Sequence, residues 1–218
     1  MISELSRSYA DEFQRLRWEL FPKGKTGQAR VIQITASRFS EGVTTTSLAL
    51  AYSIARSQRG EGVIVVEANL RAPSFHQVLG LRSNGSLARV LKDSDEIWSN
   101  VEYIDAYGLS VLPAGELPSS SDPEEFEVSL ENIGDVLSKL RGRYRYIIVD
   151  SPPLVPFRDS SIIARVTDGV IFIVEAEVTR SQVVDFAMSR LKSAEATILG
   201  FVLNKREFHI PKWLYRFL

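Results

Sequence analysis

The sequence of 218 residues contains no cysteine. This absence excludes disulfides, thiolate metal sites and cysteine nucleophiles, and it is compatible with a reducing cytoplasm. The chain also lacks an excess of charge of either sign, because 26 basic side chains stand against 27 acidic ones and the formal net charge is -1. Non-specific binding to nucleic acid needs a basic field that this composition does not provide. We therefore expect no nucleic-acid partner.

Long apolar runs are absent as well. The longest runs, at residues 63–66, 147–149 and 170–174, are far shorter than the ~20 residues that span a bilayer. Residues 1–20 alternate charged and apolar side chains, which is not the pattern of a signal peptide. We therefore expect no transmembrane segment and a cytoplasmic location, so that any association with the inner face of the cell membrane is peripheral and indirect.

Short β-branched runs alternate with helical patterns along the chain. The runs expected to be strands are residues 31–35, 63–66, 109–112, 146–149, 170–174 and 198–203, and none shows polar alternation. Helical patterns cover residues 45–59, 129–141, 159–166 and 180–194. Uninterrupted apolar strands are buried on both faces, and their alternation with helices is typical of a doubly wound, mostly parallel sheet. The sequence therefore predicts an α/β fold of three layers, α/β/α.

We predict one domain over residues 1–218, since no internal repeat or low-complexity tract divides a chain of this length. Its first part, residues 1–28, contains an amphipathic helix at 8–20 and then a loop rich in Gly and Lys. This helix packs outside the sheet or against a partner. Residues 206–218 form an aromatic and basic tail, for which docking on a partner, on a membrane surface or on the domain itself remains open.

The segment from Ser37 to Thr45 follows the first expected strand and enters a helix, which is where a phosphate-binding loop belongs. The full pattern asks for Gly, four residues, and then Gly-Lys-Ser/Thr. Here Ser37 replaces the first Gly and Val43 replaces the lysine, whereas Gly42 and the Thr44 hydroxyl are retained. The pattern indicates the shape of a phosphate loop without its main charge; a plain strand-to-helix turn is the alternative.

Polar side chains follow two more strands. Glu67 and Asn69 come after the second run, and Asp150 ends the fourth. Ligands of open parallel sheets bind beyond the carboxyl ends of the strands, so these residues predict a common site in which Asp150 would serve a magnesium ion. Helix caps and turn residues are the alternative interpretation.

Taken together, these segments resemble the tyrosine kinase domains of bacterial capsule and exopolysaccharide assembly, the BY-kinases, which are relatives of the partition-type and division-site P-loop ATPases. The resemblance covers nearly the whole chain. The matching segments are residues 34–37, 41–42, 67–73, 109–115, 146–153, 168–170 and 200–205, with Asp159 and Ala164.

The resemblance implies an ATP or ADP site with Mg²⁺. The nucleotide-binding positions that it implies are Arg38, Ser40, Glu41, Gly42, Val43, Thr44, Thr45 and, for adenine, Asn204. The implied catalytic positions are Glu67, Asn69, Arg71 and Asp150, and the implied magnesium ligands are Thr44 and Asp150. The family's ring-forming motif on the first helix aligns with Asp11, Gln14 and Arg17, although a helix packed only on its own domain is the alternative.

Three catalytic positions depart from the family together. Val43 stands at the lysine position, while Glu67 and Asn69 stand where the family has aspartates. A charge-assisted hydrogen bond contributes about 1.5–3 kcal/mol, so loss of the lysine alone weakens nucleotide binding by about 10- to 150-fold. Arg38 is a candidate replacement for the charge; a solvated loop arginine is the alternative.

The leading hypothesis is a catalytically impaired pseudokinase that regulates or scaffolds a membrane-bound polysaccharide co-polymerase, a chain-length-control protein. An active tyrosine autokinase is the first alternative, with Tyr215 as the tail's single tyrosine. A partition-type ATPase switch that dimerises with nucleotide is the second.

Overall fold

The computed structural model describes residues 9–21, 29–57, 62–81, 85–115, 130 and 132–206. The predictions for Tyr215 and for the tail beyond residue 206 lie outside these described residues.

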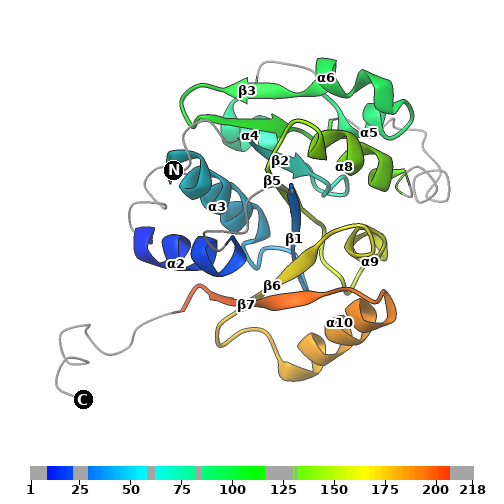
Figure 1. Cartoon of the computed structure of the whole chain (residues 1–218). Coiled ribbons are helices and arrows are strands. Elements are labelled where there is room, and N and C mark those ends of the chain that lie inside the picture. Colours follow the sequence, from blue (N-terminus) through cyan, green and yellow to red (C-terminus); the bar gives the residue numbers. More distant parts are fainter. Residues whose placement is uncertain are drawn as a thin grey trace.

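A seven-stranded sheet forms the centre of the molecule (Figure 1). Its strands are β1 (Arg30–Ala36), β2 (Val63–Glu67), β3 (Glu102–Ile104), β4 (Leu109–Leu112), β5 (Tyr146–Asp150), β6 (Gly169–Glu175) and β7 (Ile198–Asn204). Their spatial order is β3-β4-β2-β5-β1-β6-β7, and every pairing is parallel except that of β3 with β4. The predicted parallel sheet is confirmed, and only the short antiparallel edge strand β3 was not foreseen.

Helices cover both faces of this sheet (Figure 1). The described helices are α2 (Ala10–Leu20), α3 (Val43–Ser57), α4 (Phe75–Leu79), α5 (Leu87–Val90), α6 (Ile97–Asn100), α8 (Ile133–Arg141), α9 (Asp159–Ala164) and α10 (Ser181–Ser193). One apolar cluster joins the sheet to α2, α3 and α4, and two others join its opposite face to α5, α8, α9 and α10. The three-layer α/β/α architecture is therefore confirmed.

The central strands are buried along their whole length, as their uninterrupted apolar sequences require. Every residue of β2 and β5 is buried, and so is every residue of β1 after Arg30. Strands enclosed on both faces need no polar alternation. The helix after β1 begins at Val43, two residues before the predicted start at 45.

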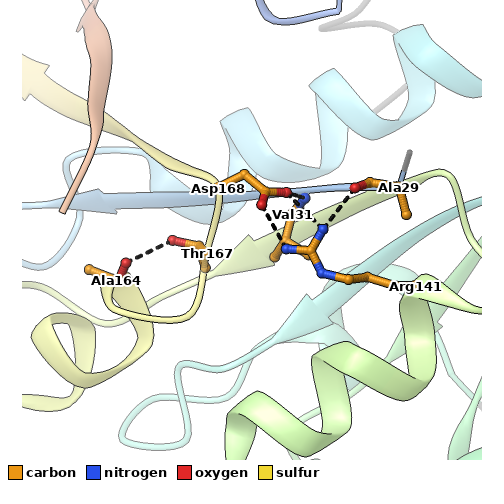
Figure 2. Close-up of polar contacts among 6 residues, drawn as sticks. All are labelled: Ala29, Val31, Arg141, Ala164, Thr167 and Asp168. Carbon is orange, nitrogen blue, oxygen red and sulfur yellow. Dashed lines mark hydrogen bonds and ion pairs between the residues drawn. The ribbon is translucent and has the colours of Figure 1, made fainter. Parts of the chain in front are cut away.

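An ion pair between Arg141, at the end of α8, and Asp168, just before β6, lies beside the amino end of β1 (Figure 2). Asp168 accepts a hydrogen bond from the Val31 N–H at 2.7 Å, and the Arg141 guanidinium donates to both of its carboxylate oxygens at 2.8 and 2.9 Å. Arg141 also donates to the Ala29 carbonyl at 2.7 Å. Partial burial raises the pKa of Asp168, but Arg141 and the Val31 N–H outweigh burial and leave that pKa below its ordinary value. This clamp, formed by Asp168, Arg141 and the Val31 N–H, fixes the amino ends of the strands. The candidate site lies at the opposite, carboxyl ends.

Candidate functional site

The register of the sheet brings the predicted site residues together at its carboxyl edge. Asp150 pairs with Ile34 on one side and with Glu67 on the other. The two carboxylates therefore end neighbouring strands, beside the turn that leads from β1 into α3. The sequence placed both residues at strand ends, and the strand order makes those ends adjacent.

The loop between β1 and α3 is held in a shape that favours glycine. Gly42 has a φ of 99°, and a Cβ atom there would lie 2.0 Å from the Asn204 side-chain nitrogen. Ser40 also has a positive φ, of 65°. The Asn204 amide donates to the Glu41 carbonyl at 2.9 Å, and the Lys205 ammonium donates to the Ser40 carbonyl at 2.7 Å. Residues at the end of β7 thus hold the backbone of this loop in place.

The Glu41 carboxylate anchors the same loop from within. It is buried and accepts hydrogen bonds from the Ser37 hydroxyl at 3.0 Å and from the Arg38 N–H at 2.9 Å. It also accepts one from the Thr179 hydroxyl, which comes from the turn after β6. Glu41 therefore shapes the loop. Sequence reasoning did not find Thr179, because nothing local connects position 179 with the loop.

Asp150 is the carboxylate nearest to the start of α3. The Thr44 hydroxyl donates to it at 2.8 Å, and the Ser47 hydroxyl lies 3.5 Å from its other oxygen. The pKa of Asp150 is raised to about 7, chiefly by burial and also by the neighbouring charge of Glu67, while the bonds from Thr44 and Ser47 oppose the rise. The predicted pair of Thr44 and Asp150 is thus in direct contact. Ser47 was not predicted, although its position one helical turn after Thr44 was the signal available.

Glu67 uses its carboxylate on backbone donors. The side chain is fully buried, and it accepts from the N–H groups of Ser74 and Phe75 on one oxygen and of Ala114 on the other, the last two at 2.8 and 2.9 Å. These bonds tie the beginning of α4 and the segment after β4 to the end of β2. The Glu67 carboxylate thus holds these segments together through backbone contacts.

Arg71 is likewise engaged. Its guanidinium bonds to Asp159 at 3.0 and 3.3 Å and lies over the Phe157 ring, 5.0 Å from the centroid. Phe157 in turn contacts Phe39 of the loop, edge to face, with ring centroids 5.8 Å apart. Three strand-end segments are joined by this set of contacts, in which Asp159 and the two phenylalanines had no predicted role.

Two polar atoms near these strand ends have no hydrogen-bond partner among the described residues. They are the buried side-chain oxygens of Asn69 and Ser151. A buried polar atom without a hydrogen bond lowers stability unless a ligand or a water molecule supplies that bond.

The side chains of Val43, Arg38 and Thr45 in the loop differ in burial. Val43 is partly buried and packs against the apolar cluster on the α3 side of the sheet. Arg38 and Thr45 are exposed. Position 43 is thus occupied by a side chain that adds to the core, and Arg38, the predicted replacement for the missing charge, is exposed.

The three residues aligned with the ring motif differ in their exposure on α2. Asp11 and Gln14 are exposed, whereas Arg17 is buried and its Nε has no hydrogen-bond partner among the described residues. The Arg17 guanidinium lies 5.9 Å from the centroid of the exposed Trp18 ring.

Residues 30–195 match the family model described as cellulose biosynthesis protein BcsQ. The chain belongs to the BcsQ family. It is also 24% identical, over 198 residues, to the tyrosine-protein kinase YwqD of Bacillus subtilis, covering 91% of this chain and 81% of YwqD. Relatives of this BcsQ-family chain are therefore bacterial tyrosine kinases, as the sequence motifs predicted.

Solved structures agree with this relationship. The kinase domain of VpsO superposes with a TM-score of 0.79 at 27% identity, covering 94% of this chain and 98% of that one. The septum site-determining protein MinD of Pyrococcus horikoshii, complexed with Mg-ADP, has the same fold with a TM-score of 0.65 at 23% identity, covering 86% and 76%. The predicted kinship with BY-kinase domains and the P-loop fold are thus confirmed.

No described helix is both long and apolar enough to span a bilayer. No group of three or more His, Cys, Asp or Glu side chains is arranged around a common metal position among the described residues. Any Mg²⁺ at this edge would thus draw on Thr44 and Asp150, with substrate or water oxygens completing its shell.

Proposed function

We propose that this BcsQ-family protein is a kinase-like regulatory or scaffolding subunit of bacterial exopolysaccharide synthesis that acts mainly through contact. The observation that carries the proposal is the commitment of the catalytic positions to structural contacts. Val43 packs against the core, Glu67 accepts backbone N–H groups, and Arg71 pairs with Asp159. Phosphoryl transfer depends on positioned charges around the phosphates, so losing a cation there costs about 10³-fold or more in rate.

The residues present fit magnesium better than they fit a triphosphate. Thr44 and Asp150 are in contact, as a hydroxyl and a carboxylate around Mg²⁺ would be, and the Asn69 oxygen is buried without a partner. No side-chain cation stands at position 43 to offset phosphate charge. We therefore expect ATP or ADP to bind weakly, with the retained loop supplying shape and backbone N–H groups.

The partner we propose is a membrane-bound polysaccharide co-polymerase. Support comes from the resemblance to capsule and exopolysaccharide kinases and from the BcsQ family match. Contact with its cytoplasmic segments would place the protein at the inner face of the cell membrane.

A working tyrosine autokinase is the second candidate. The observation that favours it is the intact contact of Thr44 with Asp150, together with the exposed Arg38 at the loop. In this reading Arg38 or a partner side chain supplies the missing charge. Phosphotyrosine on Tyr215 that disappears in Asp150→Ala, measured by mass spectrometry after incubation with Mg-ATP, would establish this candidate.

A partition-type switch is the third candidate, and a nucleotide-dependent change in solution mass would separate it from the other two.

Calorimetric titration with ADP and ATP, in magnesium and at low salt, tests the leading proposal. Asp150→Ala and Asn204→Ala serve as matched site controls. Millimolar or undetectable binding, unchanged by either substitution, is the expected result. Micromolar binding that both substitutions weaken would refute a contact-only function and would favour the autokinase or the switch.

A further inference from the structure

Strand β7 lies at one edge of the sheet that the described residues form. Within the described residues it pairs only with β6, and it is seven residues long with no charged side chain and no proline. An edge strand of this kind presents unpaired N–H and C=O groups that attract another strand.

The opposite edge of the sheet is built differently. Strand β3 is three residues long, includes Glu102 and is followed by Asp105. Short length and charge are the usual means by which proteins block pairing between sheet edges. The molecule therefore protects one edge and leaves the other apolar, which indicates that β7 is covered in the functional state.

The exposed side chains of β7 are large and apolar. Phe201 and Leu203 are 57% and 58% exposed. They pair in register with Phe172 and Val174, so both lie on the α10 face, and Phe201 contacts Phe172 edge to face. A register shift near Val170 and Ile171 leaves the stretch from residue 200 to 204 as the regular part of the strand.

The backbone direction of this stretch fixes how a second strand can add. The Asn204 carbonyl accepts from the Ala176 N–H at 2.9 Å, so the backbone groups of Asn204 point toward β6. Because the direction alternates along a strand, those of Leu203 and Phe201 point outward. Two outward-pointing residues, separated by Val202, are therefore available for hydrogen bonds.

We propose that two copies of this chain pair through antiparallel β7 strands about a two-fold axis at Val202. In this register Phe201 lies opposite Leu203 of the second copy, and each pair exchanges both of its backbone hydrogen bonds. No side chain of β7 is charged, and Lys205 lies beyond the strand with a φ of 54°, so no like charges meet across the pairing. The interface is the same patch on both copies and closes on itself, which yields a dimer instead of a fibre.

The residues that face one another at the centre of this pairing, Phe201 to Leu203, are neither catalytic positions nor part of the motif on α2, although Asn204 at the end of β7 also supports the nucleotide loop. The inference does not depend on the proposed function. Two other occupants of β7 are distinguishable by experiment: the chain's own residues 207–218, and an extended peptide of another protein.

Cysteine cross-linking tests the register, because the natural chain has no cysteine. In Val202→Cys, the thiol of one chain lies directly opposite the same thiol of the second chain. The two residues form a non-hydrogen-bonded pair, whose side chains are close enough for a disulfide. Val178→Cys is the matched control, since Val178 is 62% exposed and lies outside the strand. Mild oxidation is expected to convert Val202→Cys into a covalent dimer and to leave Val178→Cys monomeric. An absence of cross-linking at 202, or equal cross-linking at both positions, would overturn the proposed pairing.

Solution mass measured across a concentration series provides the second test. The unmodified chain is expected to approach twice its monomer mass of 24.4 kDa, and Leu203→Lys is expected to remain at the monomer mass with an unchanged melting temperature. Val178→Lys should dimerise like the unmodified chain. A monomer at every concentration, or a dimer that survives Leu203→Lys, would show that the tail, another protein or another surface is involved instead.

Discussion

Replacement of Asp150 by asparagine should make the protein more stable at neutral and alkaline pH. The side chain is fully buried, and no cation among the described residues pairs with it. Burial, with the charge of Glu67 beside it, raises its pKa from the ordinary 3.8 to about 7. The folded state therefore retains a proton that the unfolded state releases as the pH rises above 3.8, and stability falls between pH 4 and 7.

The size of the effect follows from the two pKa values. At 1.36 kcal/mol per pH unit, ionising this buried carboxyl costs about 4 kcal/mol of folding free energy at or above pH 7. Asparagine has the same shape as the protonated acid and can still bond to Thr44, but it carries no charge. The free energy of unfolding of Asp150→Asn, minus that of the natural chain, should rise from about 1 kcal/mol at pH 4.5 toward this value at pH 8.

Urea denaturation in magnesium-free buffers, at half-unit steps from pH 4.5 to 8.5, measures this difference directly. Subtraction of the two curves removes the contributions of titrating groups that do not interact with residue 150. A difference that stays flat across the range, or a variant that is less stable at pH 8, would refute the account of Asp150 as a buried carboxyl without a compensating cation.

Three further predictions concern the loop and the clamp. Val43→Lys should tighten ATP binding by about 10- to 150-fold in calorimetry if the loop lacks chiefly its charge, and no gain would indicate that more than the lysine has been lost. Gly42→Ala should lower the free energy of unfolding by about 1–2 kcal/mol, because of the positive φ and the overlap with Asn204; Asn204→Ala should then cost less in that background than alone. Asp168→Asn should lower the free energy of unfolding by about 1 kcal/mol at pH 7. This value allows for solvent screening, because the carboxylate is 39% exposed. Because the pKa of Asp168 is lowered in the folded state, this loss should shrink as the pH falls below 4, and a loss that grows there would contradict the ion pair with Arg141.

Much of the fold was predictable because its strands are uninterrupted apolar runs. The runs at 31–35 and 146–149 became β1 and β5 with boundaries shifted by one residue at most at each end. The short elements α4 to α6 were not foreseen, because four or five residues carry too little periodicity to stand out. They are fixed by tertiary bonds such as that of Glu67 to the Phe75 N–H.

The sequence predicted which residues lie at the candidate site better than it predicted which of them contact one another. Strand-end positions and a motif identified Thr44 and Asp150, which the structure brings to 2.8 Å. The sequence could not reveal that Arg71 pairs with Asp159, because that contact joins residues 88 positions apart through the strand order. Position in a motif predicts where a side chain lies, but its hydrogen-bond partners depend on the packing of other segments.

The support of the loop by β7 has an evolutionary consequence. Gly42, Glu41 and Asn204 hold the loop's shape, and none of their hydrogen bonds involves the side chain at position 43. Mutation can therefore remove or restore the lysine without first dismantling the turn around it. A lineage that abandons nucleotide chemistry in this way keeps a ready frame for it, and a return to catalysis would begin from a preserved architecture.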